Sequence, residues 1–534
     1  LCLPSFLAEL VRIGNNFGAY WSRDGRDWNL FWNTSGGAFF AAGTYNIGFF
    51  VSSYSNSQTA EATFDKVYCG PPRLKYKTSW VGSTSAGIAD GNPSNQIYSL
   101  WVKPDGTCYT NGTWDEAGRT AVIYKDGKVF HAFNNNLIGN CFAWEGGVTG
   151  NASNIFFYNA QAGPKVYRTD FTTNENFGNP LTYWGPLTSL TFNGTPLGEV
   201  RGLAASANTI FISDYAHGLL RIVDAATLAE IPASPISLPR CGPIAYDGTN
   251  FWVIQAATQD NPSTALSWHT VGTDPTSIRC YSPTGQDLSS PPPIGLGTRP
   301  AIIWADGGIP TALAFQDLAP VGTTSANDVL WVCDNGPHQY IRKYTNLTGT
   351  PAVGTPFGVD GGIWAGPVGH NGLINSPAAG TDRRFYGPVG FGTDSSGNMY
   401  VACNGGSGHV TDLRKFNSAG TMQWRVNGLL FVDHGDFDPT SDGLHYYTID
   451  KHFTMNYANT APGSEWSYTS YTRDIRANAY DIRNPLVMAA TGLQTCSTKL
   501  ARLGAGNKLY MYTSGQGRVG SSWLYYFNGE TAVP

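Results

Sequence analysis

The chain has 534 residues, of which 41% are hydrophobic and only 13% are charged, and its formal net charge is −5. Such a weakly acidic chain lacks the basic face that phosphate binding requires, which excludes a nucleic-acid partner. No apolar run is long enough to cross a bilayer, so no membrane span is expected. The 64 glycines, 28 tyrosines and 16 tryptophans favour short strands joined by turns over helices.

Residues 1–68 differ from the rest of the chain. The segments VRIGNNFGAYWSRDGRDWNLFWN and YNIGFFVSSYSNSQTAEATFDKVYC read as four or five antiparallel strands. They resemble the C-terminal half of a concanavalin A-like (laminin G-like) jelly-roll domain. The residues that carry the resemblance are Arg12, Gly14, Asn15, Tyr20, Ser22, Asp24, Gly25, Trp28, Gly48, Ser53, Ala62, Phe64 and Asp65. It implies a partial jelly-roll segment over residues 1–70, whose open sheet edge must pack on the rest of the protein or join a second copy in a homo-oligomer.

From residue 97 onward, a turn followed by a short aromatic strand recurs about eight times. Examples are SANTIFISD, DGTNFWVIQ, NDVLWVCD and DSSGNMYVAC, and a second strand with Arg or Lys often follows, as in LLRIVD and DLRKF. A unit of about 40 residues with four short strands has the size of a propeller blade. The sequence therefore predicts an all-β fold, with a seven- or eight-bladed β-propeller over residues 97–534.

The unit at 386–428 resembles an NHL-type or SMP-30-type propeller blade. The matching residues are Pro388, Gly390, Asp394, Gly397, Asn398, Tyr400, Val401, Leu413, Arg414, Lys415 and Phe416. The NHL resemblance implies an interaction platform, and the SMP-30 resemblance implies a metal-dependent, lactonase-like hydrolase. Such motifs specify a propeller better than they specify a function.

The nine cysteines contain no CxxC pair, which argues against zinc ribbons and haem attachment. Two pairs, Cys108 with Cys141 and Cys241 with Cys280, are candidate disulfides, and burial as small apolar side chains is the alternative. The low charge and five Asn-x-Ser/Thr sequons indicate a secreted or cell-surface protein, extracellular or periplasmic.

Polar residues directly after the aromatic strands are the first candidates for a site. Asp214 precedes His217, and Asp334 and Asn335 precede His338, so two blades offer a carboxylate and an imidazole at one rim. These residues are candidates for acid–base catalysis or, for Asn335, substrate binding. The alternative is that each acid caps a tight turn.

A second set of candidates is aromatic and acidic. Trp114, Asp115 and Glu116 are adjacent in NGTWDEAGR, and Glu145 follows a Trp in CFAWEGG. An aromatic face can stack on a sugar while carboxylates accept its hydroxyls, so these residues are candidates for a sugar subsite, with Asp115 and Glu116 as acid–base residues. His370 lies in a Gly-rich segment that is expected to cover a mouth and contact substrate.

The densest acidic segment is FVDHGDFDPTSDG. Its Asp436, Asp438 and Asp442 are candidate ligands for Ca²⁺, which takes six to eight oxygen ligands, although the segment lacks the order of an EF-hand. A solvated Asp-rich turn is the alternative. No organic cofactor is expected.

Three functions compete. The leading one is an extracellular carbohydrate-active or carbohydrate-binding propeller with a polysaccharide or oligosaccharide partner, and as an enzyme it would be a glycoside hydrolase or polysaccharide lyase. The alternatives are a non-catalytic surface, adhesion or assembly module, and a metal-dependent lactonase-like hydrolase.

Overall fold

The structure is a computed structural model that describes residues 7–13, 16–22, 29–34, 97–112, 121–132, 147–159, 164–171, 188–232, 234–256, 276–290, 299–304, 308–318, 327–365, 372–373, 383–405, 410–429, 435–448, 451–459, 466–471, 494–516, 522–528 and 531–533. The chain divides into two compact units, Leu1–Thr78 and Ser79–Pro534.

The described part of the first unit is a three-stranded antiparallel sheet. Its strands are β1 (Leu7–Ile13), β2 (Asn16–Ser22) and β3 (Asn29–Thr34), in that order. The register between β2 and β3 shifts at Ala19 and Tyr20, which marks a β-bulge. The other strands expected in residues 1–70 lie outside the described residues, so the jelly-roll interpretation stays a prediction.

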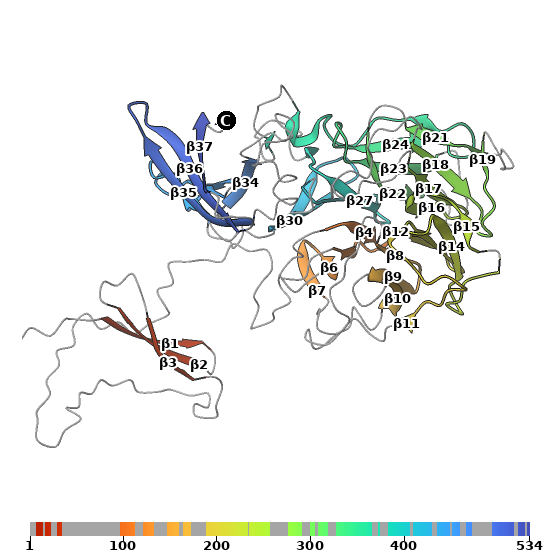
Figure 1. The fold of residues 1–534 in the computed structure, drawn as a ribbon, viewed down its shortest axis with the longest axis horizontal. Helices are drawn as coiled ribbons and strands as arrows, with labels where there is room; N and C mark the ends of the chain where they lie inside the picture. Colours follow the sequence, from red (N-terminus) through yellow and green to blue (C-terminus); the bar gives the residue numbers. More distant parts are fainter. Residues whose placement is uncertain are drawn as a thin grey trace, which may run out of the picture. The chain divides into compact units, whose positions relative to one another are not determined.

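Six four-stranded antiparallel sheets follow one another in the second unit, each with its strands in chain order (Figure 1). They are blade 1 (β4 Ser99–Val102, β5 Cys108–Asn111, β6 Ala121–Lys125, β7 Lys128–Ala132), blade 2 (β8 Val148–Gly150, β9 Asn154–Asn159, β10 Lys165–Asp170, β11 Thr188–Ser189), blade 3 (β12 Val200–Ala205, β13 Thr209–Asp214, β14 Leu219–Asp224, β15 Ile236–Ser237), blade 4 (β16 Cys241–Tyr246, β17 Phe251–Gln255, β18 Thr276–Tyr281, β21 Ile302–Trp304), blade 5 (β22 Pro310–Gln316, β23 Val329–Asp334, β24 Ile341–Thr345, β25 Ala352–Val353) and blade 6 (β27 Pro388–Thr393, β28 Met399–Cys403, β29 Val410–Phe416, β30 Met422–Leu429). The connections hold a short parallel pair, β19 (Ser289–Ser290) with β20 (Arg299–Pro300), and a 3₁₀ helix, η4 (Gly362–Trp364).

The sequence specifies the turn between the first two strands of a blade. In blades 1, 4 and 6, the carboxylates of Asp105, Asp247 and Asp394 accept a hydrogen bond at 2.9 Å from the backbone N–H two residues further on. This side-chain turn is a preferred conformation of Asp. Gly106 and Gly248, which follow two of these acids, have φ of 87°, a value that glycine adopts without steric cost.

The six blades close into a ring. The first strands lie side by side in the order β4, β8, β12, β16, β22 and β27, and β27 returns to β4. At the closing interface, a Cβ on Gly392 would lie 2.4 Å from Val102 Cγ2, so the absence of a side chain there lets blades 6 and 1 approach each other. Within the described residues, each of the six contacts between neighbouring blades has its own buried apolar cluster.

These clusters explain the apolar runs of the second strands. Alternate residues of a strand point to opposite faces, and both faces of a blade are covered by neighbours. In β13, Ile210 and Ile212 pack toward blade 2 and Phe211 packs toward blade 4. The Phe211 ring stacks on Phe251 of blade 4 at a centroid distance of 3.8 Å.

Two further sheets belong to the C-terminal part of the unit. One orders its strands as β26 (Gly372–Leu373), β34 (Trp466–Tyr471), β33 (Lys451–Met455), β32 (His445–Tyr447) and β31 (Asp436–Phe437). The other has β35 (Gln494–Leu503), β36 (Lys508–Gln516), β37 (Ser522–Asn528) and β38 (Thr531–Val533). β31 contacts β35, and the carboxylate of Asp436 accepts a hydrogen bond from the Leu500 N–H at 2.9 Å.

The all-β propeller class is confirmed, and two details of the prediction need correction. In the described residues the ring closes after six blades, not seven or eight, because β27 packs directly on β4 and leaves the two C-terminal sheets outside it. Cys241 and Cys280 are both thiols that pack into clusters on opposite faces of blade 4, so they form no disulfide. Cys108 is likewise a buried thiol, whereas Cys141 lies outside the described residues.

Candidate functional site

A residue with a side-chain amide or carboxylate ends the second strand of blades 1 to 5 and directly follows that of blade 6. The six residues are Asn111, Asn159, Asp214, Gln255, Asp334 and Asn404. The Asn111 amide donates to the carbonyls of Gly147 and Tyr158 in the next blade, at 3.3 and 2.9 Å. The Asp334 carboxylate accepts from the N–H groups of Ile309 and Gly336, both at 2.8 Å. Where these contacts are seen, the side chain fastens a strand end to a neighbouring backbone segment, as the turn-capping alternative predicts.

These strand ends lie on one mouth of the ring. The Ser213 hydroxyl, near the end of β13, donates to the Gly242 carbonyl at the start of β16. The Thr311 hydroxyl, at the start of β22, donates to the Pro388 carbonyl at the start of β27. The ends of the second strands therefore meet the starts of the first strands of neighbouring blades, and side chains after β13 and β23 face the same mouth.

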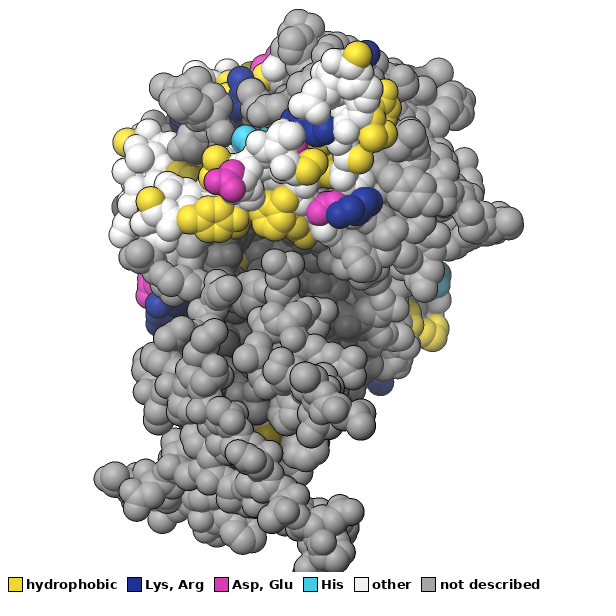
Figure 2. All heavy atoms as spheres, turned by 90° about the vertical axis from the view of Figure 1, so that its left-hand side faces the viewer, with side chains coloured by type: hydrophobic (Ala, Val, Ile, Leu, Met, Phe, Trp, Pro, Cys, Tyr) yellow, Lys and Arg dark blue, Asp and Glu magenta, His cyan; other side chains and the backbone are white. Residues whose placement is uncertain are grey.

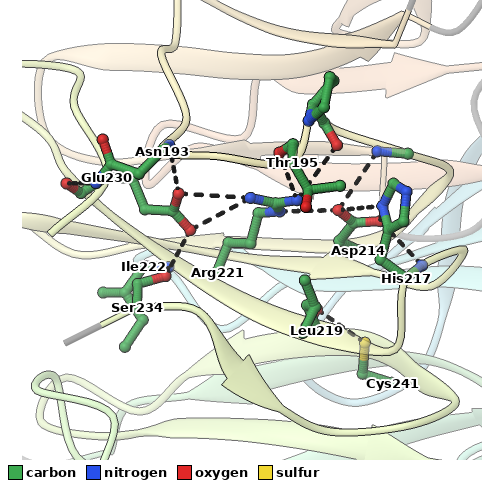
Figure 3. Close-up of polar contacts among 12 residues, drawn as sticks. Asn193, Thr195, Asp214, His217, Leu219, Arg221, Ile222, Glu230, Ser234 and Cys241 are labelled. Atoms are coloured by element: carbon green, nitrogen blue, oxygen red, sulfur yellow. Dashed lines mark hydrogen bonds and ion pairs between the residues drawn. The ribbon is translucent and has the colours of Figure 1, made fainter. Parts of the chain in front are cut away.

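Blade 3 holds a buried charge network at this mouth (Figure 3). Arg221 is fully buried; its Nε donates to Asp214 Oδ2 at 2.8 Å, and its Nη2 donates to the Thr195 carbonyl at 3.0 Å. Its Nη1 lies 3.4 Å from Glu230 Oε2, and the Ser234 hydroxyl donates to Glu230 Oε1 at 2.7 Å. The guanidinium thus satisfies two carboxylates that are removed from water.

The same carboxylate holds an imidazole. His217 Nδ1 lies 2.9 Å from both oxygens of Asp214, and because a carboxylate only accepts, Nδ1 carries the proton. The His217 side chain is 37% exposed, whereas that of Asp214 is fully buried. A Cβ on Gly198 would lie 2.8 Å from His217 Cε1, so this glycine makes room for the ring. The imidazole is therefore the part of the pair that faces solvent.

A second carboxylate belongs to the connection that leads into blade 3. Glu199 follows Gly198, and its carbonyl accepts from the Tyr215 N–H at 2.8 Å. The Glu199 side chain is 31% exposed and accepts from Arg201 Nε at 2.6 Å, and the Arg201 guanidinium lies 3.8 Å from the centre of the Tyr215 ring. An imidazole, a carboxylate and an aromatic ring thus share the blade 3 rim.

In blade 5 the corresponding acid is held differently. Asp334 is fully buried, and burial raises the pKa of its carboxyl despite the two backbone N–H groups that it accepts from. Arg342 Nη2 lies 3.9 Å from Asp334 Oδ2, compared with 2.8 Å for the equivalent pair in blade 3. Asp334 Oδ2 accepts no hydrogen bond from a described residue. The buried carboxyl of Asp334 therefore has fewer close polar partners than that of Asp214.

The imidazole of blade 5 has another partner. His338 Nδ1 lies 2.7 Å from Asp360 Oδ1, and its ring stacks on Tyr340 at a centroid distance of 5.0 Å. Here the histidine is 26% exposed and the carboxylate is 76% exposed, which reverses the arrangement of blade 3. Asn335 turns inward: its carbonyl and side-chain oxygens accept from Gln339 Nε2 at 2.9 and 3.1 Å.

The candidate calcium ligands do not converge. Asp436 pairs with Lys499 at 2.8 Å, Asp438 pairs with Arg502, and Asp442 lies in the following turn with φ of 52°. Among the described residues, no group of three His, Cys, Asp or Glu side chains is placed to hold a metal ion. The calcium site therefore stays a prediction without support from these residues.

Five of the predicted residues lie outside the described part of the chain: Trp114, Asp115, Glu116, Glu145 and His370. Conversely, Glu199 and Asp360 were missed from the sequence, because each lies in a connection between blades and only the closed ring brings it to the rim. The sequence shows the arginines as a recurring residue of the third strand, but it does not show that they are buried.

Comparisons with known proteins show a fold likeness only. No family model and no curated protein matches the chain. A chain of the nidogen/laminin complex is 12% identical, with a TM-score of 0.33 over 62% of this chain and 97% of its own. The hydrazine synthase of Kuenenia stuttgartiensis is 10% identical, with a TM-score of 0.31 over 66% and 92%. A chain of the mitotic checkpoint complex is 11% identical, with a TM-score of 0.32 over 58% and 72%.

The described residues also contain no helix of the length and apolarity needed to cross a membrane.

Proposed function

We propose that the protein is an extracellular carbohydrate-binding β-propeller that holds its ligand at this mouth without cleaving it. The observation that carries the proposal is the blade 3 rim. There the imidazole of His217 is exposed and held by a buried carboxylate, and Glu199 and Tyr215 of the same rim both contact Arg201. Binding sites for polar ligands combine aromatic surface with a few oriented polar groups.

The same geometry argues for binding over hydrolysis. Of the acids predicted for acid–base catalysis, Asp214 and Asp334 are fully buried, and Asp115 and Glu116 lie outside the described residues. Asp214 accepts from Arg221 and His217, and Asp334 accepts from two backbone N–H groups. A general acid must reach the atom that it protonates, which these side chains do not do.

An assembly module is the second candidate, and it is favoured by the C-terminal sheets. Phe437, Leu444, Tyr457 and Leu503, from these sheets and their turns, are between 39% and 58% exposed. Figure 2 shows a face on which hydrophobic side chains gather in a band beside acidic and basic ones. A homo-oligomer through the edge of the N-terminal sheet belongs to this second proposal.

The test is a glycan-binding measurement on the full chain, with a parallel assay for released reducing ends and unsaturated sugars. We expect saturable binding that falls about ten-fold in His217→Ala, the size of effect of one lost polar contact, and no released product. Gln286→Ala is the matched control, because Gln286 is an exposed polar residue in the turn at the opposite end of β18. Released product would refute the non-catalytic proposal. Binding to no glycan would refute the proposal itself and leave the assembly module.

A further inference from the structure

The blade 3 and blade 5 rims each present a histidine–carboxylate pair to the same mouth, with one blade between them. The two histidines follow the ends of second strands, His217 after β13 and His338 after β23, whereas Asp360 lies in the connection from β25 to blade 6. Blade 4 separates them, since β16 lies between β12 and β22. Packed sheets are about 10 Å apart, so in a closed ring of six blades two positions separated by one blade lie about 17 Å apart. One sugar ring cannot contact both.

The two pairs expose different atoms. In blade 3 the exposed groups are the His217 ring, at 37%, and the Glu199 carboxylate, at 31%. In blade 5 the exposed group is the Asp360 carboxylate, at 76%, which His338 holds in place. Carboxylates accept hydrogen bonds from hydroxyl groups, and an imidazole that donates its Nδ1–H to Asp214 has Nε2 as its second hydrogen-bonding atom. Each rim therefore suits a ligand that presents several hydroxyls.

The charge at these rims restricts the ligand further. Asp360 is largely exposed and pairs only with an imidazole among its described contacts, and Arg201 is the one described cation that pairs with Glu199. A ligand that carried carboxylate or sulfate groups would bring like charges against Asp360 and Glu199, which disfavours it. Neutral sugars carry no such penalty.

We infer that the two rims are subsites for one chain, and that the ligand is a neutral, linear polysaccharide long enough to reach from Glu199 and His217 to Asp360. This inference rests on the proposed carbohydrate-binding function. Two linked contacts raise affinity well beyond either one, by as much as 10²- to 10⁴-fold when the geometry permits both.

The test is calorimetric titration of the full protein with a length series of one neutral glycan and with an anionic polymer of similar length. We expect weak binding of the monosaccharide, then a rise of at least about 100-fold once the chain spans both rims. His217→Ala and Asp360→Asn should each remove most of that rise. Neither Gln286→Ala, at an exposed position in the turn after β18, nor Gln423→Ala, at an exposed position near the start of β30, should change it.

The outcomes separate this inference from the proposed function. Glycan binding whose affinity does not depend on chain length, or a rise that survives Asp360→Asn, overturns the two-subsite inference and leaves the proposed function intact. Tighter binding of the anionic polymer overturns the assignment to neutral chains. Failure to bind any glycan of any length overturns both.

Discussion

The buried Arg221 network makes the sharpest stability prediction. Substitution Arg221→Met keeps much of the volume of the side chain but leaves Asp214 and Glu230 as buried carboxylates without their cation. Removal of one partner from a buried ion pair costs about 3–5 kcal/mol, because the remaining charge stays desolvated. For a unit the size of Ser79–Pro534, the unfolding entropy is about 1 kcal/mol/K, so the melting temperature should fall by about 3–5 °C.

The matched control is Arg279→Met in blade 4. Arg279 lies opposite Val253 as Arg221 lies opposite Ile212, so the two arginines occupy the same strand position. Arg279 and its partner Asp287 are 17% and 21% exposed, and such partly solvated pairs contribute about 0–1 kcal/mol. Urea denaturation of both variants measures the difference. Equal losses in the two variants would show that burial of the network does not set its contribution, and the reasoning would fail.

Three further predictions concern acid stability, ring closure and thiols. Burial alone would raise the pKa of Asp412, but Arg414 and Arg425 outweigh it and lower it to about 2. The stability that this carboxylate contributes is present above pH about 4 and is lost as the pH falls through about 2. In urea titrations across this window, the free energy of unfolding of the wild type should therefore fall by about 2–3 kcal/mol more than that of Asp412→Asn. Equal losses in the two proteins would contradict this. Substitution Gly392→Ala should cost about 1–3 kcal/mol by the same assay, because its Cβ meets Val102, and Val102→Ala should recover part of the loss; additive effects would refute the clash. Burial raises the pKa of the Cys241 thiol to about 12, so mass spectrometry should find Cys241 and Cys280 alkylated without reductant, and only after unfolding; protection that needs a reductant to lift would mean a disulfide.

The propeller class could be predicted because its signals are local. The sequence of each blade specifies its own turn, as Asp247 does in blade 4. It also specifies a strand that is buried on both faces, as TIFIS does in β13. The number of blades in the ring is not local. It depends on whether two sheets far apart in sequence fit together, and that fit rests on glycines such as Gly390 and Gly392, which admit Leu100 and Val102 of blade 1.

The candidate site was predictable only in part, for a similar reason. The acids at strand ends were found from the repeat, and the structure gives Asp214 and Asp334 the contacts of strand fasteners. Their exposed neighbours, Glu199 and Asp360, come from the connections between blades, where the repeat has no fixed residue. A search of the repeat therefore finds the scaffold of the mouth and misses the groups that face solvent.

The loops that carry the histidines of the two rims differ in length by one residue. In blade 3, two residues lie between Asp214 and His217, and the imidazole falls on the carboxylate. In blade 5, three residues lie between Asp334 and His338, and the imidazole reaches Asp360 instead, in a loop where Gln339 adopts φ of 51°. The buried acid then loses its imidazole, and a new carboxylate becomes exposed at the mouth. An acid and a histidine that recur in two blades therefore do not have the same contacts in both. In each blade the fold decides which member of the pair fastens strands and which remains exposed, and only the exposed member can contact a ligand.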